Sequence, residues 1–484
     1  MHTLGELAIA CEGRLIGEDR PYRELVIDTR KLAAGDVFAA LRGQRVDGHQ
    51  FVPAAAHSGA AGALVERELS ALPEPLPQIL VPNVEAALAA AGRAARAQFA
   101  GPVIGVAGSN GKTTVKEMIS AILSQRGRCL ATRGNLNNQL GVPLTLLRLT
   151  ADHSSAVIEM GANRAGDVAQ LAQWARPTIG LITNAGAEHL QGFGSLEGVA
   201  RAEGEMVASL PAGATAILNA DDAFLPLWQT STAAQVLRFG IDHRGEFRAE
   251  ELRLALEGPG FVTRFRLCTP AGNVPVRLAL AGRHNVLNAL AAAAAASAAG
   301  ATLVEIAAGL GSVRAVPGRL QLRRGRNGSW LIDDSYNANP SSLRVGLETL
   351  RELPGHHWLL LGEMAELGAF ADDSHREAGR LARSLGVERL YALGALAGLA
   401  VEPFGEGAQR FDEVPQLVGA LELSLRPEVT LLVKGSRVAR LERVIEALAT
   451  DAPATGADGT HGTGASGPHG AGPGAAFAAS WQVG

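Results

Sequence analysis

The chain lacks the features of a secreted, nucleic-acid-binding or membrane-spanning protein. Its three cysteines, Cys11, Cys129 and Cys268, are odd in number and scattered, so they form neither a zinc motif nor a disulfide framework and favour a reducing compartment. A formal net charge of −4 gives the 484 residues no basic field for nucleic acid. The first six residues lack a basic segment and an apolar core, and the apolar run 289–301 is too short to span a bilayer. We therefore expect a cytoplasmic protein without nucleic-acid partners or membrane insertion.

Hydrophobic residues are abundant instead, at 47% of the chain, which is enough for several cores and about three domains. An Ala-rich segment, residues 83–100, predicts a connecting helix after a first domain at 1–82. In the next segment, 101–317, apolar strand-like runs alternate with helical stretches. This alternation predicts a parallel sheet covered by helices, the usual frame of a nucleotide-binding domain.

The alternation restarts after Pro317, with strand-like runs at 330–333, 358–361 and 429–433, so residues 318–450 predict a third α/β domain. The remainder, 451–484, consists mainly of Gly, Ala, Pro, Thr and His. Such a segment buries too little apolar surface to offset its ordering entropy, and we expect a disordered tail. Its histidines, His461 and His469, suit a weak metal-binding tract, but composition favours a solvated linker.

The stretch Gly105-Val-Ala-Gly-Ser-Asn-Gly-Lys-Thr-Thr114 joins an apolar strand to a helix and predicts a nucleotide phosphate loop. Lys112 would reach the β- and γ-phosphates, and the Thr113 hydroxyl would bind Mg²⁺. Val106 stands where the general motif has its first glycine, so the pattern is the narrower Gly-x-x-Gly-Lys-Thr, and the alternative is an ordinary glycine turn between strand and helix. The predicted nucleotide contacts here are Gly108, Ser109, Asn110, Gly111, Lys112, Thr113 and Thr114.

Two further polar residues directly follow apolar strand-like runs. Glu159 ends the run 156–158, and His189 follows the run 178–183. Because ligands bind at the carboxyl ends of strands in open α/β sheets, both are expected beside the phosphates as metal or phosphate ligands. The alternatives are a helix-capping role for Glu159 and a structural role for His189.

Several motifs are longer and more specific: Gly134-Asn-Leu-Asn-Asn138, Gly141-Val-Pro-Leu-Thr-Leu-Leu147 and Asp333-Asp-Ser-Tyr-Asn-Ala-Asn-Pro-Ser341. Shorter runs stand near the start of the chain, at Asp28-Thr-Arg30 and Phe38 to Gly43. Together with the phosphate loop they resemble the Mur ligases, ATP-dependent enzymes that join an amino acid or peptide to a cell-wall precursor. The resemblance covers about the first 450 residues. It implies a small N-terminal α/β domain for the UDP-sugar, a central ATP-binding domain and a Rossmann-like C-terminal domain.

The resemblance also implies roles for individual residues. Asn285 and Asn288 would lie near the adenine, although both suit caps of the helix that follows. Arg319 and Asp334 would reach ATP from the third domain, Arg319 at the phosphates and Asp334 at the ribose. The implied catalytic set is Lys112, Glu159, His189 and Arg319. The implied substrate contacts are Thr29, Arg30, Asn137 and Asn138 for the UDP-linked substrate, and Tyr336, Asn337, Asn339 and Lys434 for the incoming group, with a solvated Lys434 as the alternative.

Glu203 departs from the family pattern. Most members have a lysine at the matching position, which reacts with CO₂ to form a carbamate that supports a second Mg²⁺. A glutamate supplies a similar two-oxygen anion on a shorter stem, so we predict that Glu203 replaces the carbamate. The implied metal ligands are then Thr113, Glu159, His189 and Glu203. The alternative is a solvated Glu203, with Glu205 or water completing the metal shell.

The activity implied by the resemblance is ATP-dependent ligation through an acyl phosphate, with two Mg²⁺ ions, in peptidoglycan synthesis. The motifs around Asn337 are most similar to those of family members that add D-alanyl-D-alanine to UDP-N-acetylmuramoyl-tripeptide. The third amino acid of that tripeptide is lysine or diaminopimelate, and the sequence does not distinguish between them. Sister ligases that add one amino acid, folate polyglutamate ligases and a regulatory protein that binds nucleotide without ligation are the alternatives. In the absence of an apolar surface stripe, we expect a monomer.

Overall fold

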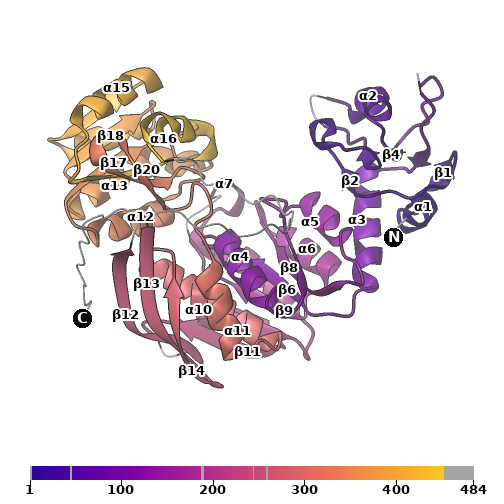
Figure 1. Cartoon of the computed structure of the whole chain (residues 1–484), viewed down its shortest axis with the longest axis horizontal. Coiled ribbons are helices and arrows are strands. Elements are labelled where there is room, and N and C mark those ends of the chain that lie inside the picture. Colours follow the sequence, from indigo (N-terminus) through magenta and orange to yellow (C-terminus); the bar gives the residue numbers. More distant parts are fainter. Residues whose placement is uncertain are drawn as a thin grey trace, which may run out of the picture. The chain divides into compact units, whose positions relative to one another are not determined.

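The computed structural model describes residues 3–43, 46–72, 74–186, 190–243, 245–257 and 260–451 (Figure 1). The described residues fall into two compact units. The first contains those within 1–184, 200–239 and 291–306, and the second contains those within 185–199, 240–290 and 307–451. Three sheets with flanking helices confirm the mixed α/β fold that the sequence predicts.

The start of the first unit is a five-stranded sheet with two small cores. β1 pairs antiparallel with β5, and the other neighbours are parallel. Long helix α3 follows; Asn83 caps it by accepting a hydrogen bond from the backbone N–H of Ala86 at 2.8 Å. The strand order is β1 (Arg14–Ile16), β5 (Gln78–Leu80), β4 (Gly62–Val65), β3 (Val37–Ala39) and β2 (Leu25–Val26), and the helices are α1 (Leu4–Ala10), α2 (Val52–His57) and α3 (Val84–Ala97).

A parallel sheet forms the rest of the first unit. Its order is β11 (Gln235–Gly240), β10 (Thr215–Asn219), β9 (Ile179–Ile182), β6 (Val103–Ala107), β8 (His153–Glu159) and β7 (Arg128–Ala131). After β8 the chain crosses to the other side of β6 to form β9, so the strand order reverses at β6. Open α/β sheets bind ligands at such a reversal, beyond the carboxyl ends of the strands. The flanking helices are α4 (Lys112–Leu123), α5 (Gly141–Leu146), α6 (Asp167–Ala175), α8 (Leu196–Ala208) and α9 (Leu225–Ser231).

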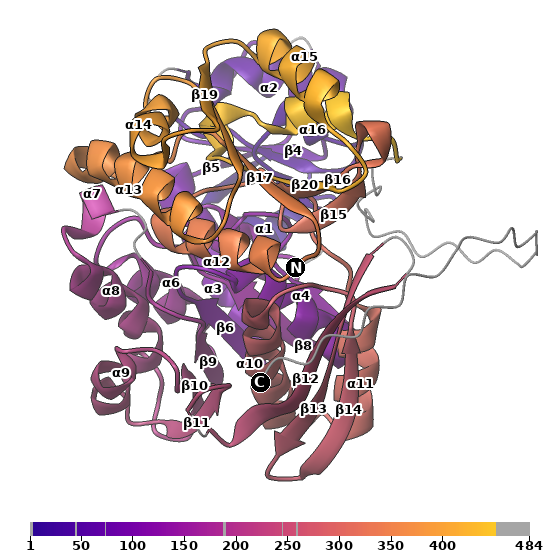
Figure 2. The same cartoon turned by 90° about the vertical axis from the view of Figure 1, so that its left-hand side faces the viewer.

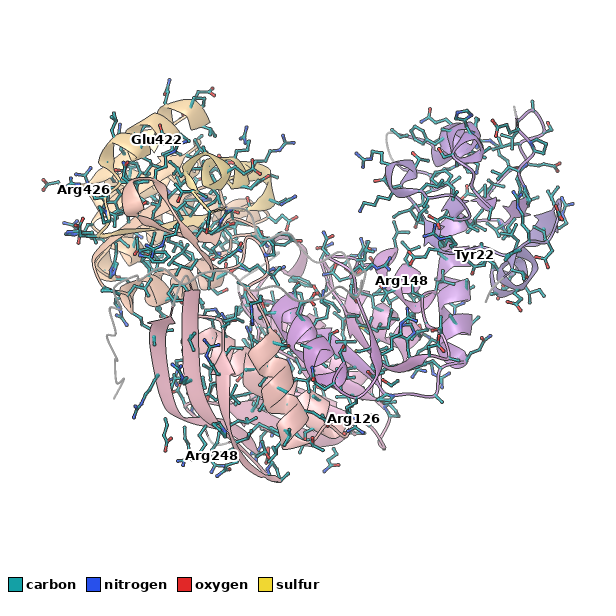
Figure 3. The ribbon with its side chains drawn as sticks, viewed as in Figure 1. Tyr22, Arg126, Arg148, Arg248, Glu422 and Arg426 are labelled. Carbon is teal, nitrogen blue, oxygen red and sulfur yellow. The ribbon has the colours of Figure 1, made fainter. Side chains whose placement is uncertain are left out.

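Contacts within the first unit join the five-stranded part to the segment after β7. Arg133 pairs with Glu24 at 2.8 Å, and Arg148, labelled in Figure 3, lies 4.0 Å from the same carboxylate. Burial lowers the pKa of Arg148 to about 10. Tyr22, also labelled, is partly buried in this part, and burial raises its pKa to about 12. The segment that carries Asn137 and Asn138 is therefore tied to the N-terminal sheet.

The second unit contains an antiparallel group and a six-stranded sheet. The antiparallel strands are β12 (Phe247–Glu257), β13 (Gly260–Thr269) and β14 (Gly272–Leu278). Helix α7 (Leu190–Phe193) also belongs to this unit, whereas the residues of α10 (Arg283–Ala298) and α11 (Leu303–Ser312) are divided between the two units. The larger sheet has the order β15 (Gln321–Arg324), β16 (Trp330–Asp334), β20 (Val429–Lys434), β17 (His356–Leu361), β18 (Arg389–Leu393) and β19 (Ala408–Phe411), with only β15 antiparallel.

Alternating side chains of this larger sheet enter two separate cores. Ile332 and Leu432 join the core under α12 (Pro340–Arg351) and α13 (Ala371–Ser384), whereas Leu331 and Leu431 join the core under α15 (Val414–Ser424) and α16 (Glu442–Leu448) (Figure 2). The short helix α14 (Val401–Phe404) completes the unit. Because both faces are covered, the functional groups of this sheet lie at its strand ends.

The end of the described chain is held by an ion pair. Arg323 on β15 binds Asp451, with the guanidinium 2.8 Å from a carboxylate oxygen, so this first residue of the predicted tail has a defined place. Residues 452–484, including His461 and His469, lie outside the described residues. Among the helices of the described ranges, we find none with the length and hydropathy that a membrane span requires.

Candidate active site

The predicted phosphate loop connects β6 to α4. Gly108 and Gly111 have φ values of +121° and +86°, which favour glycine, and a Cβ on Gly108 would lie 2.1 Å from the Thr183 hydroxyl. The residues after β9 hold the loop: Ser109 N–H donates to the Asn184 carbonyl at 2.9 Å, and the Thr183 hydroxyl donates to the Asn110 carbonyl at 2.7 Å. The residues after β9 therefore support the conformation of this loop.

Lys112 is the first residue of α4, and its ammonium folds back over the loop. It donates to the Gly108 carbonyl and, at 3.1 Å, to the Ser109 carbonyl. The N-cap residue of this helix is Gly111, which has no side chain to accept a hydrogen bond from the first backbone N–H groups. The helix start and the lysine thus bring positive charge to one place, which suits the phosphates of a nucleotide.

The carboxylate of Glu159 lies beside this helix, at the end of β8, and is only 2% exposed. Oε1 accepts hydrogen bonds from the Thr113 hydroxyl at 3.2 Å and from Asn137 Nδ2 at 2.9 Å. Oε2 is buried and has no hydrogen-bond partner. An unsatisfied carboxylate oxygen next to a threonine hydroxyl fits Mg²⁺, which prefers oxygen ligands. The structure therefore joins three residues that the sequence singles out separately.

Glu203 on α8 also reaches the loop and is 1% exposed, so the alternative of a solvated side chain is wrong. Its Oε2 accepts a hydrogen bond from Gly108 N–H at 2.6 Å. Burial raises the pKa of this carboxyl group, whereas the Lys112 charge and the Gly108 hydrogen bond oppose the increase. Glu205, its alternative as a metal ligand, instead accepts from the N–H groups of Gly166 and Ala169 at the start of α6.

The fourth predicted metal ligand, His189, lies outside the described residues. Within the described ranges, no group of three or more His, Cys, Asp or Glu side chains is arranged to hold a metal ion. Thr113 and Glu159 are thus the predicted ligands that the structure brings into direct contact.

The second unit has a site of its own at the ends of β16 and β20. Asp334 and Lys434 are in register on these neighbouring strands, and Lys434 Nζ lies 2.6 Å from Asp334 Oδ2. The ammonium also donates to the Asn337 carbonyl at 3.0 Å, and Asp334 Oδ1 accepts from Leu320 N–H at 3.2 Å. Lys434 is 1% exposed, so the alternative of a solvated lysine is wrong.

Two arginines have their guanidinium groups over the ring of Tyr336. The guanidinium carbons of Arg319 and Arg437 lie 4.5 Å and 5.8 Å from its ring centroid. Arg319 Nε is buried and has no hydrogen-bond partner. The sequence motif at 433–437 contains Arg437, but sequence reasoning assigned it no role, because stacking on a residue 101 positions earlier leaves no local signal. The ring and its two cations are suited to an anionic ligand.

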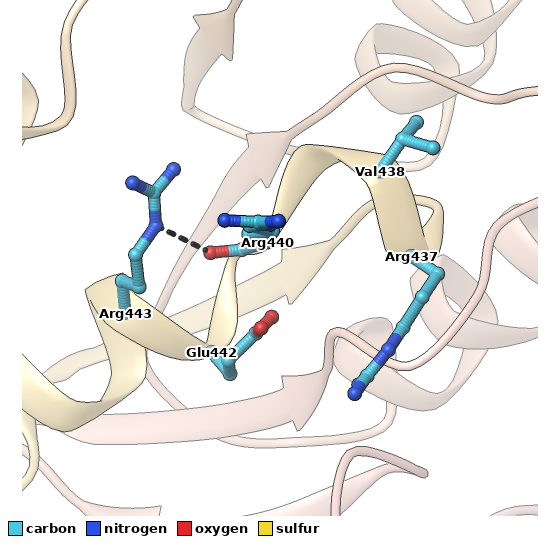
Figure 4. A pocket seen from close by; sticks show the side chains of 5 residues that line it. All are labelled: Arg437, Val438, Arg440, Glu442 and Arg443. Carbon is cyan, nitrogen blue, oxygen red and sulfur yellow. Dashed lines mark hydrogen bonds between the residues drawn. The ribbon is translucent and has the colours of Figure 1, made fainter. Parts of the chain in front are cut away.

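Arg437 also lines a cavity of about 520 Å³ (Figure 4). Arg443 Nε donates to the Arg440 carbonyl at 3.3 Å across this cavity wall. The lining includes three arginines and one glutamate, so its net charge is positive. The lining residues are Arg437, Val438, Arg440, Glu442 and Arg443.

The predicted adenine residues Asn285 and Asn288 lie buried at the start of α10. Asn288 Nδ2 donates to Asn285 Oδ1 at 3.2 Å, and Asn285 Nδ2 donates to the Ala281 carbonyl at 2.7 Å. His284, which sequence reasoning missed, is affected by the charges of Asp334 and Lys434. Burial lowers its pKa to about 4, so the imidazole is neutral at pH 7.

The remaining predicted substrate residues mostly make local contacts. Asn138 Oδ1 accepts from Gly141 N–H at 2.9 Å at the start of α5, and Asn339 caps α12 in a reciprocal pair with Ser342. Thr29 and Arg30 form a single turn, and the exposed Arg30 guanidinium binds Asp28 at 2.8 Å. The Arg30 hydrogen bonds lower the pKa of Asp28 to about 2. The assignment of these four residues to substrate remains a prediction.

Comparison with known proteins matches this chain to one family. Three family models cover successive parts of the chain: "Mur ligase family, catalytic domain" over 21–98, "Mur ligase middle domain" over 106–296 and "Mur ligase, glutamate ligase domain" over 318–437. UDP-N-acetylmuramoyl-tripeptide–D-alanyl-D-alanine ligase of Escherichia coli is 42% identical over 450 residues, 92% of this chain and 98% of the relative. The same-named ligase of Synechocystis is 37% identical over 91% of this chain and 95% of its own.

Solved structures agree with this assignment. MurF from Acinetobacter baumannii matches with a TM-score of 0.83 at 34% identity, over 92% of this chain and 98% of the other. MurF ligase from Thermotoga maritima in complex with ADP matches with a TM-score of 0.75 at 27% identity, over 88% and 96%. The resemblance noted in the sequence is thereby confirmed, and the chain belongs to the Mur ligase family.

Proposed function

We propose that this chain is the ligase that joins D-alanyl-D-alanine to UDP-N-acetylmuramoyl-tripeptide, using ATP, to give the pentapeptide precursor of peptidoglycan. The observation that carries the proposal is the 42% identity with the Escherichia coli ligase across 92% of the chain. The pairing of Thr113 with Glu159 beside Lys112 supports the use of ATP at this site. The proposal also includes a cytoplasmic location, because free, scattered cysteines suit a reducing compartment. It further includes a monomeric state, as expected from the sequence.

The proposed reaction has two steps, in each of which one bond forms as another breaks. The terminal carboxylate of the tripeptide attacks the γ-phosphorus of ATP, and ADP leaves as an acyl phosphate forms. The amine of D-alanyl-D-alanine then attacks the acyl carbon, phosphate leaves, and the amine proton passes to solvent. Negative charge gathers at the phosphoryl group in both steps, so positioned cations supply the main stabilisation. Lys112 would provide one at the phosphate loop, and Arg319 is proposed as a second.

Mg²⁺ would screen the phosphates and align them for attack when it is bound. Thr113 and Glu159 are the proposed ligands of one ion, and His189 and Glu203 are proposed to contribute to a second. Glu203 supplies a carboxylate where most family members carry a carbamylated lysine. Its hydrogen bond to Gly108 couples that carboxylate to the phosphate loop, which supports a role beside the nucleotide.

The second unit would supply the nucleoside and dipeptide contacts. Asn285 and Asn288 are proposed for the adenine, and Asp334 for the ribose. Tyr336, Asn337, Asn339 and Lys434 are proposed for the dipeptide. Lys434 would act by fixing Asp334 and the Asn337 carbonyl, because both already bind its ammonium.

The test is phosphate release from ATP and Mg²⁺ with UDP-N-acetylmuramoyl-tripeptide, with and without D-alanyl-D-alanine, followed by product mass. We expect release that depends on the dipeptide and a product heavier by one dipeptide less water. Parallel reactions with lysine- and diaminopimelate-containing tripeptides would identify the preferred third residue. Release with a different acceptor would assign the chain to a sister ligase, and ATP binding without any release would indicate a regulatory protein.

A further inference from the structure

Lys116 is a buried charged residue that the proposed reaction does not use. It lies on α4, one helical turn after Lys112, and its side chain is 0% exposed. A buried ammonium is costly unless nearby groups compensate its charge and hydrogen bonds. The chain contains only four lysines among its 44 basic residues, and Lys116 is one of the two that are fully buried.

Three groups surround the Lys116 ammonium. It donates to the Thr132 carbonyl at 2.8 Å and pairs with Glu117 Oε1 at 2.8 Å. Its third neighbour is Glu159 Oε2, at 3.9 Å. This is the carboxylate oxygen that has no hydrogen bond. The contact between Lys116 and Glu159 is therefore an ion pair that leaves the oxygen open.

Thr132 contacts both residues of this ion pair. Its hydroxyl accepts a hydrogen bond from the Glu159 backbone N–H at 3.0 Å, while its carbonyl accepts from Lys116. Thr132 thus links the ammonium of Lys116 to the strand end that carries Glu159. Because both side chains are buried, a metal ion bound at Glu159 would lie close to the charge of Lys116.

We propose that Lys116 is a positioning residue that limits the affinity of Glu159 for divalent cations, so that the metal binds firmly only together with nucleotide. The inference rests on the proposed Mg²⁺ site at Thr113 and Glu159. Lys116, Glu117 and Glu159 together carry a charge of −1, whereas the two carboxylates alone would carry −2, so the ammonium weakens the attraction of this buried site for a divalent cation. ATP would supply the missing negative charge through its phosphate oxygens, as Mg²⁺ sites with few protein carboxylates require.

Charge variants around this ammonium provide the test, with Mn²⁺ binding measured by electron paramagnetic resonance in the presence and absence of ADP. Lys116→Met makes the local charge −2, and Glu117→Gln makes it 0. In the absence of ADP, we expect Lys116→Met to bind Mn²⁺ about tenfold more tightly than the unmodified protein, equivalent to about 1.4 kcal/mol. Glu117→Gln should bind more weakly, and the double variant should return close to the original affinity.

Glu117 is a suitable matched position because its side chain is 45% exposed and Gln leaves its packing intact. Adding ADP should tighten Mn²⁺ binding more in the unmodified protein than in Lys116→Met. Affinities that do not follow this charge order, with Lys116→Met equal to or weaker than the unmodified protein, would overturn the inference while leaving the metal site in place. Absence of Mn²⁺ binding in every variant, even with ADP, would overturn the proposed metal site itself and the inference with it.

Discussion

Among the described residues, two strand ends place a carboxylate beside a buried lysine, and the two pairs differ. At the end of β16, Asp334 and Lys434 are 2.6 Å apart, and the other carboxylate oxygen accepts a backbone hydrogen bond. At the end of β8, Glu159 and Lys116 are 3.9 Å apart, and one carboxylate oxygen has no hydrogen bond. Both oxygens of the first carboxylate have a hydrogen-bond partner in the protein, whereas one oxygen of the second has none.

This difference separates two uses of the same residue types. We call Asp334–Lys434 the closed pair, because both carboxylate oxygens have partners, and Glu159–Lys116 the open pair, because one oxygen has none. A closed pair fixes local structure, because removal of either partner leaves an uncompensated charge in the interior. An open pair lowers the stability of the protein without ligand and is retained where a ligand completes it. We therefore assign Asp334 and Lys434 a role in anchoring the local structure, in addition to their proposed ribose and dipeptide contacts, and we assign metal binding to Glu159.

Removal of the charge at the open pair should have the largest effect on activity. Glu159→Gln keeps the size and the hydrogen bond from Thr113 but loses the anionic oxygen. We expect the rate of ligation to fall by about 10²–10³, as for other groups that stabilise transition-state charge. The midpoint of thermal unfolding should change little. Ligation at the original rate would show that Glu159 is not the metal ligand.

The closed pair should show the reverse pattern, with stability as the main readout. Asp334→Asn leaves Lys434 buried without a counter-charge, which typically costs about 3–5 kcal/mol of the free energy of unfolding. Denaturant unfolding of the second unit measures this loss. The double variant Asp334→Asn with Lys434→Met should recover part of it. An unchanged unfolding curve for Asp334→Asn would show that this pair is not an anchor.

His284 near the closed pair predicts a pH dependence of stability. Its pKa is lowered from 6.5 to about 4, so on acidification the unfolded chain binds a proton before the folded protein does. This contribution to stability is complete above pH 6.5 and should decline between pH 6.5 and pH 4, by a few kcal/mol in total. Unfolding measured across this range should show a shallower decline for His284→Gln; identical slopes would contradict the prediction.

Glu203 offers a smaller test at the phosphate loop. Glu203→Gln preserves an oxygen for the Gly108 hydrogen bond but removes the negative charge. We expect a higher Mg²⁺ requirement and about tenfold slower turnover, because the carboxylate charge would be lost beside the nucleotide. Steady-state kinetics over a range of Mg²⁺ concentrations would measure both effects. If the kinetics are unchanged, Glu203 only holds the loop, and the proposal that it replaces a carbamylated lysine is wrong.

The sequence predicts the parts of the site that follow from strand ends and local motifs. The phosphate loop and Glu159 each directly end or follow an apolar run, so their placement could be inferred from the α/β pattern alone, whereas Asp334 is implied by the family resemblance. Helical spacing offers a further signal for Glu203 and Glu205, because residues two apart on a helix point to different sides. In the structure one binds the phosphate loop, and the other binds the start of α6.

Contacts between distant segments could not be read in the same way. Lys116 appears in the sequence as an ordinary helix lysine, and its burial depends on how Thr132 and Glu159 pack around it. Lys434 likewise ends a strand in a way that suits a solvated side chain, until Asp334 from the neighbouring strand is placed beside it. The stacking of Arg319 and Arg437 on Tyr336 joins three segments with no shared local pattern.

The most direct test of this account is a crystal structure with ADP and Mn²⁺, in which anomalous scattering locates the metal. We predict a peak bonded to the Glu159 carboxylate and the Thr113 hydroxyl, with the Asp334–Lys434 pair intact and free of metal. A metal bound at Asp334, or a nucleotide-bound metal that makes no bond to Glu159, would contradict the distinction between the open and the closed pair.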